Sequence, residues 1–419
     1  MNKWLKYSLL GFLVIALTLS GFAGGFVAGH SLATSNQPLL ALPGAPAITT
    51  PQAANSATPS DYQTLFKPFW EAWDLVHKQY VDQPVDDTLL MQGAIRGMLA
   101  SLGDQHTSYM DPSQFTQANS ELSGEYSGIG AWVDTSGEWL TINSPMPGSP
   151  AEKAGLLPGD VIIKVDGDDM TGVPPELVIK RVLGPQGTLV KLTVMRQGEA
   201  KPLEFEVTRA KIVVPSVEGK MLDNGVAYVK ISTFGDKTTS ELKATLTELM
   251  KQNPRGMVLD LRNNGGGYLQ TAVEVMSQFL EGGQTVLIEK YGDGTQQKYE
   301  SQAGGLATKI PLVVLVNEYS ASASEITAGA IQDYGRGKLV GVTTYGKGSV
   351  QIWTPLNDEK GAVRITVAKW YTPLDRTIHK VGLTPDVVVE MTEADHTAKR
   401  DPQLDAALKT LEEIIAAAK

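Results

Sequence analysis

Between residues 210 and 392, short apolar runs rich in valine and leucine alternate with longer runs of helical periodicity. The strand-like runs lie at 226–232, 256–262 and 311–316, and the helix-like runs at 240–252, 268–280 and 322–334. Such alternation is typical of βαβ units, in which crossover helices connect parallel strands. We therefore predict a mostly parallel α/β core for residues 210–392.

Four other segments flank this core. Residues 61–125 carry apolar side chains three or four positions apart, which predicts helices, and residues 393–419 predict a final amphipathic helical segment. Residues 126–209 change to short strand-like runs, which predicts a β-domain. Residues 31–60 contain five prolines and no charged residue, which indicates an extended linker.

The amino-terminal segment, residues 1–30, indicates export. Lys3 and Lys6 precede an uncharged stretch from Tyr7 to Gly29. As a helix this stretch reaches ~34 Å, enough to cross a bilayer core of about 30 Å. The lysines favour a cytoplasmic start, with the rest of the chain outside the membrane. A cleavable signal is the alternative, because Ser31-Leu32-Ala33 offers a small-x-small site, and the product would then be secreted or periplasmic.

Composition disfavours several classes of function. The formal net charge of −10 argues against nucleic-acid binding, which requires a basic surface. The chain has no cysteine, which excludes disulfides, cysteine-ligated metals and a cysteine nucleophile. Its five histidines form no HExxH-type pair, so we predict neither a metal site nor a cofactor.

Three serines, Ser320, Ser322 and Ser324, lie where a strand-like run passes into a helix-like run. This junction falls at the carboxyl end of a parallel sheet, where α/β folds bind their ligands. Free N–H groups at the helix start favour developing negative charge, as a serine nucleophile requires. A serine at this position is also a common helix cap. The segment alone leaves both roles open.

Lys347 lies between Gly346 and Gly348 in the string YGKGSVQ, so the backbone there can approach another element closely. A lysine acts as a base only when neutral, and a pKa near 7 requires a depression of about three units, which burial supplies. A solvated surface lysine is the alternative.

Residues 341–347 also match GxxxxGK, the start of a phosphate-binding loop. Gly348 replaces the Ser or Thr that holds magnesium in such loops, and a strand-like run follows instead of a helix. A nucleotide-dependent enzyme is therefore disfavoured.

The string DLRNNGGG at 260–267 places three glycines directly after a strand-like run. Consecutive glycines expose backbone N–H groups that suit an oxyanion. The alternative is a flexible connecting loop, in which Asp260 and Arg262 form a pair that holds the loop.

Together, DLRNNGGG, VNEYSASASEI and YGKGSVQ resemble the carboxyl-terminal processing peptidases, also called tail-specific serine proteases. GDQHTSYMDP at 103–112 and IHKVGLTPDVVVE at 378–390 are similar to the same family, so the resemblance spans roughly residues 62–415. It implies a crotonase-like α/β protease core at 210–392 and an inserted PDZ domain at 126–209. It also implies a helical region before the PDZ domain and an endopeptidase that cuts exported polypeptides near their carboxyl ends.

Motif by motif, the resemblance implies that Ser322 is the nucleophile, Lys347 the general base and Gln351 the residue that orients the lysine. Residues four apart on an extended strand are ~13 Å apart, so the glycine turn or the reach of the lysine must close that gap.

For the oxyanion hole, the resemblance implies the backbone N–H of Ala323 and that of one glycine in 265–267. We choose Gly266 from this cluster, in which Gly265 stands where the family often has proline.

Within the predicted PDZ domain, Gly128-Ile129-Gly130 matches the loop that captures a carboxylate when an extended peptide adds to the sheet. The alternative is a plain glycine-rich strand start. The predicted partners are polypeptides bound through their carboxyl-terminal tails, and the membrane through residues 1–30. A PDZ scaffold with an inactive core is the rival hypothesis, and the sequence leaves open a homo-oligomer formed through the terminal helices.

Overall fold

The computed structural model describes residues 60–417, which fall into two compact units divided between Val85 and Asp86. The predicted anchor or signal (1–30) and all but the last residue of the predicted linker (31–60) lie outside the described residues. None of the described helices combines the length and the apolar character that a membrane span requires.

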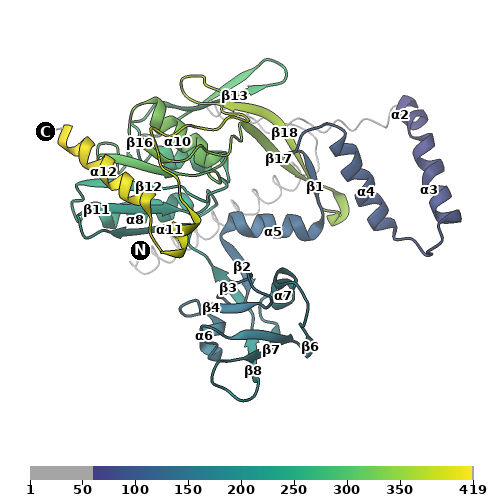
Figure 1. Ribbon diagram of the computed structural model, residues 1–419. Helices are drawn as coiled ribbons and strands as arrows, with labels where there is room; N and C mark the ends of the chain where they lie inside the picture. The colour runs from purple at the N-terminus through teal and green to yellow at the C-terminus, as the bar shows by residue number, and fades with distance from the viewer. Residues whose placement is uncertain (1–59, 418–419) are drawn as a thin grey trace, which may run out of the picture. The chain divides into compact units, whose positions relative to one another are not determined.

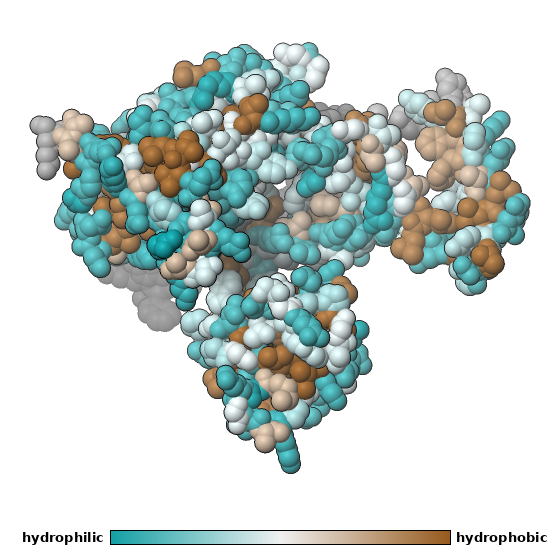
Figure 2. Space-filling view, viewed as in Figure 1, coloured by the Kyte–Doolittle hydropathy of each residue, from teal (hydrophilic) through white to brown (hydrophobic). Residues whose placement is uncertain are grey.

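The described part of the first unit consists of two consecutive helices, α2 (Ser60–Leu65) and α3 (Lys67–Gln79). Helix α3 has apolar side chains three or four positions apart, as predicted, but it buries none of them. Phe66 and Trp70 remain 45% and 58% exposed. Figure 2 shows the resulting apolar surface on these helices.

The second unit begins with α4 (Asp87–Ala100), β1 (Ser108–Met110) and α5 (Pro112–Ser123). Local capping explains where α5 begins and ends. The Asp111 side chain accepts the Gln114 N–H at the start of α5, Pro112 occupies the first turn, and Gly124 ends the helix with φ +64°. The prediction of helices within residues 61–125 is confirmed.

A small β-domain follows, attached through a two-stranded antiparallel connection of β2 (Glu125–Gly128) and β9 (Ala210–Val213). Its sheet has the order β3-β4-β5-β7-β8, with β6 paired to β5. The strands are β3 (Ala131–Asp134), β4 (Thr141–Pro145), β5 (Val161–Val165), β6 (Asp168–Asp169), β7 (Leu189–Met195) and β8 (Leu203–Thr208). The helices α6 (Pro150–Ala154) and α7 (Pro175–Val182) pack on this sheet. Strand β3 lies at the edge of the sheet.

The core contains a six-stranded sheet of order β10-β11-β12-β15-β16-β19, parallel except for β10. The strands are β10 (Val217–Met221), β11 (Val226–Ile231), β12 (Gly256–Asp260), β15 (Leu312–Val316), β16 (Lys338–Gly341) and β19 (Val387–Val388). The predicted parallel α/β core is confirmed.

Alternate residues of these strands face opposite layers of helices (Figure 1). Leu259 and its neighbours pack with α8 (Thr238–Met250), α9 (Leu269–Met276) and α10 (Ala323–Asp333). Val258 and its neighbours pack instead with α12 (Pro402–Ala417). The short elements η1 (Asn357–Glu359) and α11 (Glu393–Thr397) lie in connections.

A second sheet was not predicted as a separate layer. It has the order β1-β18-β13-β14, with β17 also paired to β18. Its strands from the core region are β13 (Thr285–Tyr291), β14 (Gln296–Glu300), β17 (Ser349–Pro355) and β18 (Ala362–Tyr371). Strand β1 comes from the helical region and pairs with β18, so this region is joined to the core through main-chain hydrogen bonds.

Candidate active site

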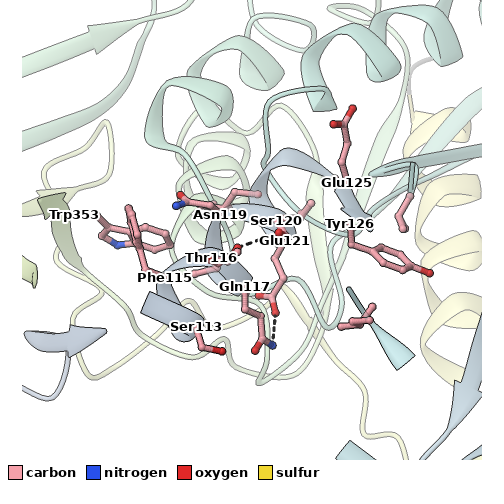
Figure 3. A pocket seen from close by; sticks show the side chains of 18 of the residues that line it. Ser113, Phe115, Thr116, Gln117, Asn119, Ser120, Glu121, Glu125, Tyr126 and Trp353 are labelled. Atoms are coloured by element: carbon pink, nitrogen blue, oxygen red, sulfur yellow. Dashed lines mark hydrogen bonds between the residues drawn. The ribbon is translucent and has the colours of Figure 1, made fainter. Parts of the chain in front are cut away.

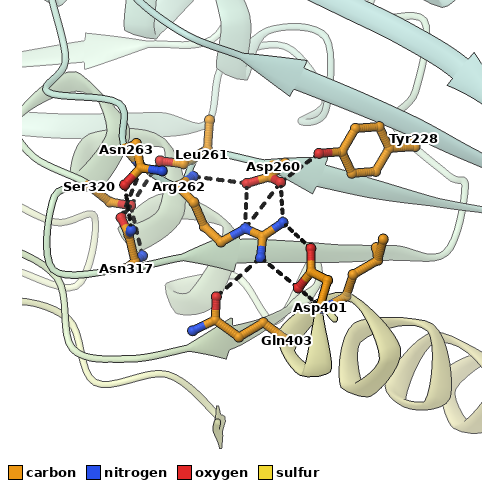
Figure 4. A network of polar contacts seen from close by, with 10 residues as sticks. Tyr228, Asp260, Leu261, Arg262, Asn263, Asn317, Ser320, Asp401 and Gln403 are labelled. Carbon is orange, nitrogen blue, oxygen red and sulfur yellow. Dashed lines mark hydrogen bonds and ion pairs between the residues drawn. The ribbon is translucent and has the colours of Figure 1, made fainter. Parts of the chain in front are cut away.

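Two of the three candidate serines have a structural role. Ser320 and Ser324 are fully buried and donate through Oγ to the carbonyls of Leu261 and Asn264, each at 2.8 Å. These bonds join the loop after β15 and the first turn of α10 to the glycine loop after β12, the neighbour of β15 in the sheet. Figure 4 shows Ser320 beside Leu261. Ser322, between them, is half-buried and lines a groove. The structure therefore singles out Ser322 as the serine accessible for chemistry.

The backbone of Ser322 is strained, with φ 55° and ψ −114°. Residues other than glycine rarely adopt these backbone angles, because they cost about 1–3 kcal/mol of conformational free energy. Such strained residues are concentrated at active sites. Gly266 lies directly against this residue, because a Cβ added to it would be 2.8 Å from Ser322 Cβ and 2.9 Å from the Ala323 nitrogen. Only glycine fits there, so the structure brings together the predicted nucleophile and both predicted oxyanion residues.

The two predicted oxyanion donors differ in their hydrogen bonding. Ala323 is the first residue of α10, so its N–H belongs to the first turn, which has no partner within the helix. The N–H of Gly266 donates to Asn264 Oδ1 at 2.9 Å. In this conformation the N–H of Gly266, the predicted oxyanion residue, is therefore already occupied. The Asn264 side chain, which also donates to the Ile231 carbonyl, holds the N–H elsewhere.

Lys347 lies in a tightly packed turn. A Cβ on Gly346 would be 2.9 Å from the Gly382 nitrogen, and one on Gly348 would be 2.9 Å from His379 Cβ. The predicted close approach of the backbone is thus confirmed. Burial lowers the pKa of the half-buried Lys347, and the positive charge of Arg364 lowers it further, while Glu325 opposes both. This environment favours the neutral amine that a general base requires.

Glu325 connects the serine and lysine segments, and the sequence analysis missed it. Its fully buried carboxylate accepts four hydrogen bonds, from Ser322 N, Thr344 Oγ1, Gly346 N and Lys347 N, at 2.9, 2.6, 2.7 and 2.9 Å. Burial raises the pKa of this carboxyl, and the four hydrogen bonds oppose that rise. The S-x-x-E spacing from Ser322 to Glu325, a capping pattern, was the available signal.

The predicted dyad is near the groove but not in hydrogen-bond contact. Among residues 60–417 the structure has no hydrogen bond from the Lys347 amine to Ser322 Oγ or to Gln351. The Gln351 amide instead donates through Nε2 to Ser349 Oγ at 2.9 Å and Thr366 Oγ1 at 3.1 Å. A β-bulge between Val350 and Gln351 interrupts the pairing with β18. The predicted Gln351–Lys347 contact is therefore not made in this conformation.

Ser322, Lys347 and Gln351 line one groove of about 1930 Å³. Its wall includes the side of α5 that carries Phe115 and Thr116, with Trp353 of β17 6.4 Å from the Phe115 ring centre (Figure 3). The groove continues to the small β-domain, where its apolar lining comes from β3, α7 and their flanks: Ile129, Ala131, Val133, Ile179, Val182 and Leu183. One continuous surface thus joins the predicted tail site to the predicted nucleophile.

The predicted carboxylate loop, Gly128-Ile129-Gly130, leads into the edge strand β3. The Ile129 carbonyl accepts the N–H of Ala151 in α6 at 2.8 Å, and Gly130 has φ +74°. Because β3 pairs with β4 alone within the described chain, its other edge offers main-chain groups to an added strand.

Arg262 stabilises the end of β12 rather than the reaction site. It contacts the carboxylates of Asp260 and Asp401 at 2.6 and 2.8 Å, and Tyr228 donates to Asp260 at 2.6 Å (Figure 4). Asp401 directly precedes α12, so this network ties α12 to the strand. The alternative that Asp260 and Arg262 hold the loop agrees with this geometry. Among residues 60–417, no three acidic or histidine side chains group as metal ligands.

Comparison with known families gives three matches. Residues 225–389 match peptidase family S41, residues 141–196 match the PDZ domain, and residues 20–114 match the N-terminal domain of the activating protease CtpB.

Similar proteins carry corresponding descriptions. A carboxy-terminal-processing protease of Bartonella bacilliformis is 38% identical over 344 residues, which cover 80% of this chain and 78% of that protein. The carboxy-terminal processing protease CtpB of Bacillus subtilis is 36% identical over 342 residues, covering 81% and 70%. A solved structure assigned to the S41 proteases of Bacteroides fragilis covers 81% of this chain and 96% of its own, with a TM-score of 0.53. Its 18% identity supports similarity of fold alone.

Proposed function

Since the chain belongs to peptidase family S41, as a carboxy-terminal processing serine protease with a PDZ domain, we propose that Ser322 and Lys347 are its catalytic dyad. We propose further that the PDZ domain delivers the carboxyl-terminal tail of an exported polypeptide to this dyad. The continuous groove from β3 to Ser322 is the observation that carries the proposal.

In the proposed reaction, neutral Lys347 takes the proton of Ser322 as Oγ attacks a peptide carbonyl. The negative charge develops on the carbonyl oxygen, next to the Ala323 N–H. Lys347 then returns the proton to the leaving amine, and the C–N bond breaks to give an acyl-enzyme, which water hydrolyses. The lowered pKa of Lys347 and the strained backbone of Ser322 both support these roles.

Two further roles require a change from the conformation described. Gln351 would accept a hydrogen bond from the Lys347 amine, and Gly266 would exchange its bond with Asn264 for one with the oxyanion. Both residues already line the groove in which the reaction is proposed to occur. A bound tail can drive this change only if it binds the rearranged conformation more tightly than the conformation described above.

For the tail, we propose addition of an extended peptide to the free edge of β3, with its carboxylate at Gly128-Ile129-Gly130. The lining of the groove at this end is apolar, so we expect tails that end in apolar residues to bind best. Lys180 of α7 lies at the same end and favours an acidic group further along the tail.

We also propose that the chain is exported and that it is divided into the domains predicted from its sequence. Lys3, Lys6 and the uncharged stretch after them support export, with residues 1–30 as anchor or cleaved signal. The parallel core sheet is compatible with a crotonase-like fold, and the domain limits at 30, 60, 125, 209 and 392 remain predictions. The uncovered apolar face of α3 is compatible with a homo-oligomer.

The test is cleavage of an unstructured polypeptide with an apolar tail by the purified chain and by Ser322→Ala and Lys347→Met. We expect each substitution to lower kcat by at least roughly 10³-fold, because nucleophile and base act as a unit. Ser320→Ala and Lys369→Met are the matched controls. Ser320→Ala removes a buried hydrogen bond and should lower stability without abolishing cleavage.

Full activity of Ser322→Ala or Lys347→Met would exclude the proposed dyad. Binding of the tail without any cleavage by the unaltered chain would instead support the rival hypothesis of an inactive PDZ scaffold.

A further inference from the structure

The string GDQHTSYMDP at 103–112 has no role in the proposed reaction, yet its first acidic residue lies close to the active site. Asp104 accepts the N–H of His106 through Oδ1 at 3.0 Å and the hydroxyl of Thr107 through Oδ2 at 2.7 Å. Burial by itself raises the pKa of this carboxyl, but hydrogen bonds from Thr366, Thr107 and His106 outweigh it and hold the pKa at about 2. Asp104 is therefore a carboxylate at any working pH, and it can only accept hydrogen bonds.

The loop that carries Asp104 is fixed to β18. The Thr366 N–H donates to Thr107 Oγ1 at 3.1 Å, and Arg364 donates through Nε to the His106 carbonyl at 2.8 Å. Strand β1 then continues the contact, since Ser108 pairs with Arg364. This packing holds the Thr366 side chain between the carboxylate of Asp104 and the amide of Gln351.

The direction of these hydrogen bonds determines how Gln351 is oriented. Because Asp104 accepts only, the Thr366 hydroxyl must donate to it, and the Thr366 oxygen is left as an acceptor. The Gln351 NH₂ group fills that acceptor site at 3.1 Å and donates its second hydrogen to Ser349 at 2.9 Å. Both amide hydrogens are thereby used, and Oε1 is the part of the amide left to accept a hydrogen bond from another donor.

We propose that Asp104 is a positioning residue for the catalytic lysine, acting through Thr366 to present Oε1 of Gln351 to the Lys347 amine. The proposal rests on the Ser322–Lys347 mechanism above. It gives the 103–112 string a function, because a carboxylate outside the α/β core fixes the orientation of an amide inside it. Without the carboxylate, the Thr366 hydroxyl can donate to Gln351, the amide turns over, and an N–H group faces the lysine instead.

The expected signature is a shift in pH dependence. A carbonyl oxygen facing Lys347 favours the charged amine, whereas an N–H group disfavours it. Loss of the Asp104–Thr366 bond should therefore lower the lysine pKa and move the acid limb of kcat to lower pH, while the plateau falls. The charged and titratable groups that face Lys347 are Glu325 of α10, Arg364 of β18 and His106 of the 104–107 loop, and all three stay unchanged.

The experiment compares kcat and KM against pH for Thr366→Val, Thr366→Ser and Asp104→Asn on an unstructured polypeptide. Thr366→Val removes the hydroxyl without changing any charge, and we expect kcat to fall about tenfold, the acid limb to move to lower pH and KM to stay within about twofold. Thr366→Ser keeps the hydroxyl and should restore the wild-type profile. Asp104→Asn should resemble Thr366→Val.

Asp293→Asn is the matched control, since Asp293 also accepts an N–H and a hydroxyl, both from Thr295, in the exposed turn between β13 and β14. An unmoved acid limb in Thr366→Val, or equal impairment of Thr366→Ser, would overturn the relay. Ser322→Ala, measured in parallel, separates the two proposals: if it is inactive and Thr366→Val behaves as wild type, only the relay fails. If Ser322→Ala cleaves, the mechanism itself fails.

Discussion

The pattern S-x-x-E occurs at the start of two helices, and the serine and glutamate are held very differently in each. Ser149 and Glu152 begin α6 of the PDZ domain, and Ser322 and Glu325 begin α10 of the protease core. At α6 the serine has an extended backbone, φ −71° and ψ 162°, and its Oγ accepts the Glu152 N–H at 3.1 Å. Ser322 instead has φ 55° and ψ −114°.

The two glutamates differ even more. Glu152 accepts the Gly148 N–H at 2.6 Å at an exposed position. Glu325 is fully buried, and only one of its four hydrogen bonds comes from the serine, while three come from Thr344, Gly346 and Lys347. A capping pattern therefore becomes an active-site support when a second loop brings its N–H groups to the same carboxylate. The local sequence cannot distinguish the two cases, because that second loop lies about twenty residues away.

The largest contrast is expected for the glutamates. In Glu325→Gln an NH₂ group faces donors that need an acceptor, so we expect the free energy of unfolding to fall by about 2–3 kcal/mol and kcat to fall at least roughly 100-fold. Glu152→Gln, its exposed counterpart, should change stability by less than ~0.5 kcal/mol and leave kcat unchanged. Denaturant unfolding and steady-state cleavage measure both. Equal effects of the two substitutions would contradict a special role of the buried Glu325 carboxylate.

Substitution of the serines by glycine tests the backbone difference. Glycine adopts the angles of Ser322 without strain, so Ser322→Gly should raise the free energy of unfolding by about 1 kcal/mol while abolishing cleavage. Ser149→Gly replaces one acceptable helix cap by another. It should lower the free energy of unfolding by only about 0.3 kcal/mol. Higher stability with loss of cleavage in Ser322→Gly, and neither effect in Ser149→Gly, would support backbone strain at Ser322 alone. A destabilised Ser322→Gly would contradict it.

A smaller effect is expected from the positive charge of Arg364 near Lys347. Helix α6 has no counterpart of this pair. In the proposed mechanism activity requires neutral Lys347, so we expect it to be lost as pH falls through the lysine pKa. Burial lowers that pKa and Arg364 lowers it further, so Arg364→Gln should raise it and move the acid limb to higher pH by about half a unit. Lys369→Gln, an exposed change on the same strand, should leave the limb in place. A pH profile that does not move in Arg364→Gln would argue against a net effect of Arg364 on the lysine pKa.

Much of the fold follows from local signals. The caps at Asp111 and Ser149 and the turn at Asp166-Gly167, with φ 53° and 91°, are decided by a few neighbouring residues, and the helical character of residues 61–125 was predicted from local spacing. The separate sheet of β1, β18, β13 and β14 was not, because pairing between distant strands leaves no local pattern.

The site shows the same division. The approach of Gly266 to Ser322 and the packing of the turn around Lys347 follow from glycines visible in the sequence. The four donors of Glu325, the bond from Gly266 to Asn264 and the position of Asp104 depend on which loops meet in the folded chain. Residue type indicated which groups could react, but only tertiary contacts determine how they are held.

The pairing of β1 with β18 has a consequence for the timing of activity. The bond from Arg364 to the His106 carbonyl joins residues 258 positions apart, so the support of the lysine cannot form until most of the chain exists. At about 5–20 residues per second, synthesis of that interval takes roughly 13–50 s. Ser322 enters the chain only near the end of this interval, so the proposed nucleophile exists only briefly before the strand that supports the proposed base. We therefore expect the chain to stay inactive until β18 has been made and has paired with β1.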